Sequence, residues 1–236
     1  MSKVLVIGDI HEPACHVGYR RFCQDLYDQW SCNRVVFIGD IVDLLNISFH
    51  QKNVDADGVT REVEMAYEGV QKWCKAFPKA EVMTGNHDAR VCRLAASVNI
   101  PIQFIRDYAE VWNTPKWQWK GCTTIDEVYY FHGEGVGGQC PALKRAIKNG
   151  QSSVMGHQHT QSGVRWSVGD NLRVFGMDTG CGIDADHISM HYGKNFINRP
   201  ILSAGAVIDG IPYHEIMPIA RGEKYHKSRF TRKTAK

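Results

Sequence analysis

Five short apolar runs in this chain are each followed almost at once by an acidic, amide or histidine side chain. The runs cover residues 3–7, 35–38, 80–84, 128–131 and 152–155. Each has the length and composition of a buried β-strand. Burying a polar group without a partner costs free energy. Polar side chains directly after five buried strands are therefore not expected by chance. The pattern predicts an α/β sheet with binding residues at the carboxyl ends of its strands.

The stretch Gly39-Asp40-Ile41-Val42-Asp43 follows the second of these runs. Asp40 then lies at a strand end, where its two carboxylate oxygens can each hold a different cation. We hypothesise that Asp40 bridges two metal ions. Taken alone, an aspartate in this position is more often a turn-forming or helix-capping residue.

The other four runs lead into further side chains that commonly bind metals. They are Asp9 and His11, Asn86 and His87, His132, and His157 and His159. Carboxylate oxygens and imidazole nitrogens together suit a divalent transition metal. Each motif is weak by itself, and Asn86 could instead cap the helix that follows it.

The remaining segments predict helices and, late in the chain, antiparallel strands. Helices are expected over residues 16–30, 59–77, 89–97, 101–113 and 141–148. Strands are expected over 163–168, 172–176, 204–208 and 211–216, with a hairpin turn at Asp209-Gly210. Two polar segments stay open: 44–58 with His50, and 180–200 with Asp184, Asp186, His187 and His191.

The chain has 236 residues, which is enough for one large domain, expected over residues 1–220. The net charge is +3, but residues 221–236 hold seven Lys or Arg and one Glu. The rest of the chain is therefore net negative. We expect 221–236 to be a flexible basic tail.

Nothing in the sequence resembles a secretion signal or a membrane span, since no apolar run approaches about 18 residues. The eight cysteines include no Cys-x-x-Cys pair. These features predict a cytoplasmic protein with reduced thiols and no membrane partner. The oligomeric state cannot be predicted from them.

Taken in order, the motifs resemble those of the calcineurin-like metallophosphoesterases. The matching series is Asp9-x-His11, Gly39-Asp40-x-x-Asp43, Gly85-Asn86-His87-Asp88, His132 and Gly156-His157-x-His159. The resemblance covers residues 4 to about 160. It implies a four-layer α/β/β/α sandwich with two mixed sheets and a dinuclear metal site at the strand carboxyl ends.

The resemblance also implies roles for single residues. One metal ion would be held by Asp9, His11, Asp40 and His159, and the other by Asp40, Asn86, His132 and His157. His87 would donate a proton, oriented by Asp43. The donor set suits two divalent ions, with manganese first and iron or zinc as alternatives.

One position departs from the pattern. Leu44 stands where the protein Ser/Thr phosphatases of this family have an arginine that binds phosphate, which argues against that branch. Arg90, two residues after Asp88, is a candidate substitute that would bind the substrate.

The implied activity is metal-dependent hydrolysis of a phosphate ester by a hydroxide that bridges the two metals. The basic tail favours a phosphodiester, and nucleic acid is a candidate substrate. The alternatives are a phosphomonoesterase, acting on small molecules or proteins, and a non-catalytic metal-binding scaffold on the same fold.

Overall fold

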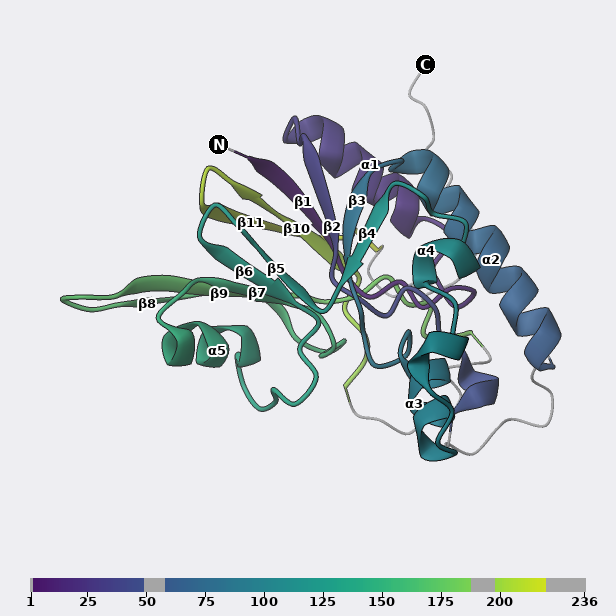
Figure 1. The fold of residues 1–236 in the computed structure, drawn as a ribbon. Helices are drawn as coiled ribbons and strands as arrows, with labels where there is room; N and C mark the ends of the chain where they lie inside the picture. Colours follow the sequence, from purple (N-terminus) through teal and green to yellow (C-terminus); the bar gives the residue numbers. More distant parts are fainter. Residues whose placement is uncertain (1, 49–57, 188–197, 220–236) are drawn as a thin grey trace, which may run out of the picture.

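Two mixed β-sheets, stacked face to face, form the centre of the structure (Figure 1). The computed structural model describes residues 2–48, 58–187 and 198–219. One sheet has six strands in the order β11 (Ile211–Ile216), β10 (Ser203–Ile208), β1 (Lys3–Ile7), β2 (Arg34–Phe37), β3 (Ala80–Met83) and β4 (Trp117–Lys120). The other has five, in the order β5 (Cys122–Ile125), β6 (Val128–Phe131), β7 (Ser153–Met155), β9 (Arg173–Thr179) and β8 (Ser162–Val168).

The strands that carry the predicted motifs run parallel within their sheets. β1, β2, β3 and β4 are mutually parallel, and so are β6, β7 and β9. Antiparallel strands β10, β11, β5 and β8 extend the sheets at their edges. The carboxyl ends of neighbouring parallel strands lie together, so the motifs of each sheet come out at one end.

Helices cover the outer faces of both sheets. Helices α1 (Tyr19–Gln29) and α2 (Val59–Ala76) lie on the six-stranded sheet, and α5 (Pro141–Asn149) packs on β9 and β7 of the other. Figure 1 shows this order of layers. The predicted four-layer α/β/β/α sandwich with two mixed sheets is confirmed.

Two apolar cores, and a smaller cluster between α5 and the five-stranded sheet, hold the layers together. The larger one joins α1 and α2 to the six-stranded sheet around Trp73, Tyr19 and Phe37, whose side chains are fully buried. The second lies between the sheets and includes Tyr130 and Phe175. Truncating a buried aromatic side chain of this kind typically costs about 3–5 kcal/mol.

The helix predicted over residues 101–113 is wrong. The chain forms instead a short 3-10 turn, η2 (Ile102–Phe104), and a single helical turn, α4 (Tyr108–Val111). Ile105 and Asp107 are extended, so backbone hydrogen bonding is interrupted and a new helix begins after Asp107. Helix α3 (Arg90–Ser97) precedes this segment, and η1 (Leu45–Ile47) follows the β2 loop. Strand β5 was not predicted.

Some predictions fall on residues outside the described ranges. They concern His50, His191 and the basic tail beyond residue 220. In the part of the chain that the structure describes, no helix has both the length and the apolar character needed to cross a bilayer.

Candidate metal centre

The predicted site residues meet at one end of the two sheets. Asp9, Asp40 and Asn86 follow β1, β2 and β3 of the six-stranded sheet, whereas His132 and His157 follow β6 and β7 of the other. The site is therefore assembled from both sheets. The packing of the sheets sets the distance between its two halves.

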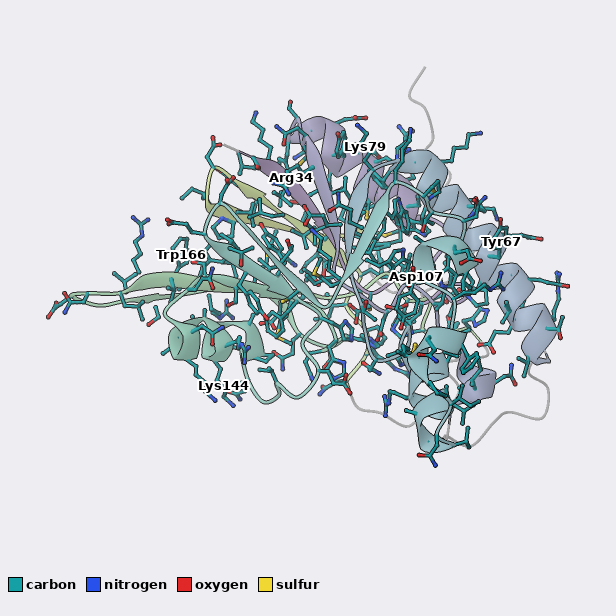
Figure 2. The ribbon with its side chains drawn as sticks, in the orientation of Figure 1. Arg34, Tyr67, Lys79, Asp107, Lys144 and Trp166 are labelled. Atoms are coloured by element: carbon teal, nitrogen blue, oxygen red, sulfur yellow. The ribbon has the colours of Figure 1, made fainter. Side chains whose placement is uncertain are left out.

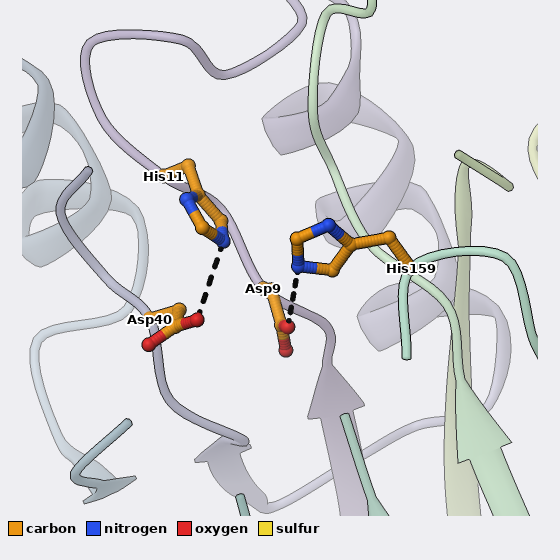
Figure 3. A group of neighbouring side chains, drawn as sticks. All are labelled: Asp9, His11, Asp40 and His159. Atoms are coloured by element: carbon orange, nitrogen blue, oxygen red, sulfur yellow. Dashed lines mark ion pairs between the residues drawn. The ribbon is translucent and has the colours of Figure 1, made fainter. Parts of the chain in front are cut away.

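A first cluster contains Asp9, His11, Asp40 and His159 (Figure 3). Asp9 Oδ2 lies 3.1 Å from His159 Nε2, and His11 Nε2 lies 3.4 Å from Asp40 Oδ2. Each of the four residues offers an atom within 4.8 Å of those of the others. Two carboxylates and two imidazoles therefore lie together, and they are the four residues that the family resemblance assigns to one metal ion.

A second cluster contains Asp40, His132 and His157. Asp40 Oδ2 lies 3.3 Å from His132 Nε2, which lies 3.2 Å from His157 Nδ1. The amide oxygen of Asn86 is 3.0 Å from the same His132 nitrogen. Asp40 thus belongs to both clusters, as a bridging ligand must.

Asn86 does not cap α3. The N-cap position of this helix is occupied by Ala89, and no side chain caps it. The Asn86 side chain instead faces His132. The ligand interpretation of Asn86 therefore fits the geometry better than the capping interpretation.

Asp43 connects His11 to His87. Its Oδ1 lies 3.0 Å from Nδ1 of each ring. His87 Nδ1 is also 2.9 Å from the Asp43 carbonyl oxygen, so acceptors on both sides hold the hydrogen on that nitrogen. His87 Nε2 then faces the guanidinium of Arg90 at 3.2 Å, and Arg90 also donates to the Asp43 carbonyl.

The electrostatics of the cluster favour a positive charge at its centre. Burial would lower the pKa of His11, but the carboxylates of Asp40 and Asp43 outweigh it and raise that pKa to about 10. Burial likewise opposes the Asp40 carboxylate, yet the neighbouring His132 and His11 hold the pKa of Asp40 well below its usual range. A cation placed here would find charged carboxylates already desolvated.

The hydrogen bonding of these residues fits a bound cation. Among the described residues, Asp9 Oδ1, His11 Nε2 and His159 Nε2 are buried and have no hydrogen-bond partner. Buried polar atoms are normally satisfied, and those that are not usually have a functional reason. His132 Nδ1 lies 3.0 Å from the Ile38 carbonyl oxygen, to which it can donate. That bond directs the lone pair of Nε2 into the cluster, as in metal-binding histidines generally.

Glycines provide the space in which the carboxylates sit. A Cβ on Gly85 would lie 2.1 Å from Asp40 Oδ1, and one on Gly156 would lie 2.1 Å from Asp9 Oδ1. Three site residues also adopt the left-handed region, with φ of 47° at His11, 48° at Asp40 and 66° at His157. Such backbone strain tends to occur at functional sites.

Asp88 has a supporting role that the sequence reasoning missed. Its carboxylate accepts backbone N–H groups from Ile41 and Gly85 at 2.9 Å and from Val42 at 3.3 Å. It therefore joins the loop after β2 to the loop after β3. The signal was present in Gly85-Asn86-His87-Asp88, where an acidic residue follows the histidine directly.

The segment around Asp184 is a buried connection. Asp184 Oδ1 accepts the backbone N–H of Asp186, and the Asp184 N–H donates to the carbonyl of Ala14. Neither Asp184 nor His187 belongs to the metal-binding clusters of the described residues.

Leu44 is buried in the larger apolar core, and its side chain brings no charge to the site.

The family model for calcineurin-like phosphoesterases matches residues 2–175, which is most of the chain. The chain belongs to this family. The resemblance predicted from the motifs is thus confirmed, and the family together with the His and Asp clusters indicates a divalent metal site. No protein in the set of curated sequences matches.

Solved structures with similar folds are distant in sequence. Vacuolar protein sorting 29 from Cryptosporidium parvum is 14% identical, covers 92% of this chain and 96% of its own, and has a TM-score of 0.45. A metallophosphoesterase from Sphaerobacter thermophilus is 13% identical over 93% of this chain and 89% of its own, with a TM-score of 0.48. Yfce, a phosphoesterase from E. coli, is 16% identical over 89% and 90%, with a TM-score of 0.40.

Proposed function

We propose that the chain is a metal-dependent phosphoesterase that prefers phosphodiesters. The observation that carries the proposal is the position of Asp40 in two adjoining clusters of carboxylate and imidazole groups. Two metal ions that share a ligand can contact both the attacking and the leaving oxygen of an in-line displacement. Membership of the phosphoesterase family supports this chemistry.

The chain's residues would hold the ions as two sets. Asp9, His11, Asp40 and His159 form the first set, and Asp40, Asn86, His132 and His157 the second. When bound, divalent ions lower the pKa of water and neutralise charge that develops on phosphorus. The nitrogen and oxygen donors suit manganese, iron or zinc, and we propose manganese first.

His87 is proposed to protonate the leaving group. Asp43 fixes the hydrogen on Nδ1 and orients the ring, which leaves Nε2 directed towards Arg90. Burial and the charge of His11 lower the pKa of His87. A negatively charged ester beside Nε2 would attract the Arg90 guanidinium. It would also favour binding of a proton at Nε2, so that the proton donor lies next to the substrate.

Arg90 is proposed to bind the phosphate. It would take the role of the arginine that the Ser/Thr phosphatases of the family have at the position of Leu44. Its guanidinium contacts His87 and the Asp43 carbonyl, so it lies next to the proposed proton donor. Guanidinium groups bind phosphate oxygens through paired hydrogen bonds. The preference for a diester, with nucleic acid as a candidate, rests on the basic residues of 221–236.

The test compares turnover of bis-p-nitrophenyl phosphate, a diester, with that of p-nitrophenyl phosphate, a monoester. We expect metal-dependent turnover that EDTA abolishes, with the diester hydrolysed faster. His87→Gln should reduce turnover of an alkyl ester by about 10²-fold or more but affect p-nitrophenyl esters less, because that leaving group needs no proton. Its metal content should stay unchanged.

His214→Gln is a matched control, since His214 hydrogen-bonds Ser162 and belongs to none of the metal-binding clusters of the described residues. Faster hydrolysis of the monoester would refute the diester preference. A protein that binds two metals but hydrolyses neither ester would be a metal-binding scaffold. Equal losses for alkyl and p-nitrophenyl esters in His87→Gln would show that His87 is not the proton donor.

A further inference from the structure

Glu62, in the first turn of helix α2, is an acidic residue inside the protein. It is only 3% exposed, although Glu is almost never fully buried unless its carboxylate has partners. Tyr67 of the same helix is exposed, on the side of α2 that is turned away from the sheets (Figure 2). Glu62 therefore belongs to the inner face of α2, and its burial needs a reason.

The partners of the Glu62 carboxylate lie in the loop that follows β2. Oε1 accepts the backbone N–H of Leu45 at 2.5 Å, and Oε2 accepts the backbone N–H of Asn46 at 3.0 Å. The side-chain amide of Asn46 donates to the same Oε2 at 2.8 Å. Hydrogen bonds to a carboxylate are stronger than those between neutral groups, so these three fix the loop to α2.

The loop requires a restraint at this place because its backbone is strained. Leu44, directly before Leu45, adopts the left-handed region with φ of 50°, which residues other than glycine seldom do. Such a conformation persists only where the surroundings hold it. On the other side of Leu44, the N–H of Asp43 donates to the carbonyl oxygen of Glu12 at 3.0 Å. Glu12 thus holds the chain at Asp43 itself, and Glu62 holds it just after Leu44.

The conformation of Leu44 bears directly on His87. The Asp43 carbonyl oxygen belongs to the peptide group that joins Asp43 to Leu44, and rotation about φ of Leu44 turns that group. This oxygen lies 2.9 Å from His87 Nδ1, and the Asp43 carboxylate lies 3.0 Å from the same nitrogen. Both acceptors that orient the His87 ring therefore depend on a backbone that Glu62 restrains.

We infer that Glu62 is a positioning residue that acts through Asp43 on the orientation of His87. Its own hydrogen bonds go to the loop and not to a candidate metal ligand. The kinetic consequence rests on the proposed function, because it assumes that His87 donates a proton to the leaving group. A displacement of about 1 Å in a reacting group can cost about 10²-fold in rate.

The kinetic test uses Glu62→Gln, which keeps the size of the side chain but replaces one acceptor oxygen with an NH2 group. At saturating metal ion, kcat for an alkyl ester should fall about 10-fold or more, and kcat for a p-nitrophenyl ester should fall less, because that leaving group needs no proton. In a protein that already carries His87→Gln, adding Glu62→Gln should change kcat for the alkyl ester by less than about 3-fold, because the two residues act in series.

Glu64→Gln is the matched control, since Glu64 lies on the same helix but is exposed and pairs with Arg61. It should keep the kcat of the unaltered protein for both esters. If Glu62 had only a structural role, Glu62→Gln would lower Tm and slow both esters alike. Asn46→Ala, which removes the side-chain donor to Oε2, should act in the same direction as Glu62→Gln with smaller losses, and it decides the question if Glu62→Gln does not fold.

A second measurement needs no turnover. The proton on His87 Nδ1 can be followed by nuclear magnetic resonance in the metal-free protein, as the imidazole signal that disappears in His87→Gln. Glu62→Gln should shift or broaden this signal, whereas Glu64→Gln should leave it in place. If the unaltered protein hydrolyses no ester, the proposed function fails, and this signal alone decides the role of Glu62.

Two results would overturn the inference. One is a His87 signal that is the same in folded Glu62→Gln as in the unaltered protein. The other is a double variant of Glu62→Gln and His87→Gln whose loss in kcat equals the product of the two single losses, which would show that Glu62 does not act through His87.

Discussion

Replacing Gly85 with alanine tests the geometry of the proposed bridging ligand. The Gly85 backbone is not in the left-handed region, so an alanine is strained only by its neighbours. Its Cβ would lie 2.1 Å from Asp40 Oδ1 and 2.4 Å from the Asp40 nitrogen. Ordinary contact begins near 3.4 Å, so the Asp40 carboxylate must move by more than about 1 Å.

The distance between a metal ion and a ligand atom varies by only about 0.2 Å, so a shift of that size is too large for a bound ligand. Because Asp40 belongs to both clusters, Gly85→Ala should weaken the affinity for both ions at least about 10-fold. Overpacking also costs about 1–3 kcal/mol in the metal-free protein. For a chain of this size that lowers Tm by about 2–12 °C.

Two other glycines supply the comparison. Gly137→Ala should change nothing, because no atom lies within 4 Å of its Cβ position. Gly156→Ala displaces Asp9, which belongs to one cluster, so one ion should be weakened more than the other. Elemental analysis and titration calorimetry measure the ions, and thermal unfolding with EDTA measures Tm. If Gly85→Ala matches Gly137→Ala in metal content and Tm, the argument from Asp40 is refuted.

Two further predictions concern stability and substrate. Burial raises the pKa of Asp178 to about 6, although this carboxylate accepts the N–H of Ala142 at the start of α5. The pKa of Asp178 is higher in the folded protein than in the unfolded chain, so the protonated group stabilises the fold. This contribution is complete below about pH 4 and is lost as the pH rises through 6, which changes the free energy of unfolding by up to about 3 kcal/mol. At pH 7.5, Asp178→Asn should therefore unfold at a higher urea concentration than the unaltered protein, whereas at pH 4 the two should unfold at the same concentration. An equal difference between the two proteins at both pH values would contradict this. Deleting residues 222–236 should raise KM for an oligonucleotide and reduce its salt dependence, without changing kcat/KM for bis-p-nitrophenyl phosphate. Unchanged oligonucleotide kinetics at low salt would remove the reason for proposing nucleic acid.

The strands that lead into the site could be predicted because two signals agree there. β1 and β2 are short, apolar and fully buried over most of their length, and each is followed by polar residues. The family resemblance then placed each candidate ligand. The structure brings all of these side chains together, though the roles proposed for them remain predictions.

Other features depend on tertiary contacts that a local pattern does not contain. Ile102 and Phe104 are apolar, but neither side chain is buried against another element, so no packing supports a long helix over 101–113. Strand β5 is a four-residue edge strand that buries only Ile125 and pairs with β6, so it lacks the buried apolar run that marks strands such as β1 and β2. The contact of Asp43 with both His11 and His87 depends on how the loop after β2 meets two other loops.

The division of the site between two sheets has a consequence for the cohesion of the molecule. Asp9 Oδ2 accepts the backbone N–H of His157, and these residues are 148 positions apart in the chain. An ion held by Asp9 and His159 would thus cross-link two segments that are far apart in the chain. Bringing such segments together costs considerable loop-closure entropy. The apolar core between the sheets already joins them elsewhere. Removing the ions would therefore weaken the junction between the sheets at the carboxyl ends of their strands, where only direct contacts such as His157–Asp9 and His132–Ile38 would remain, while the core kept the sheets together along the rest of their length.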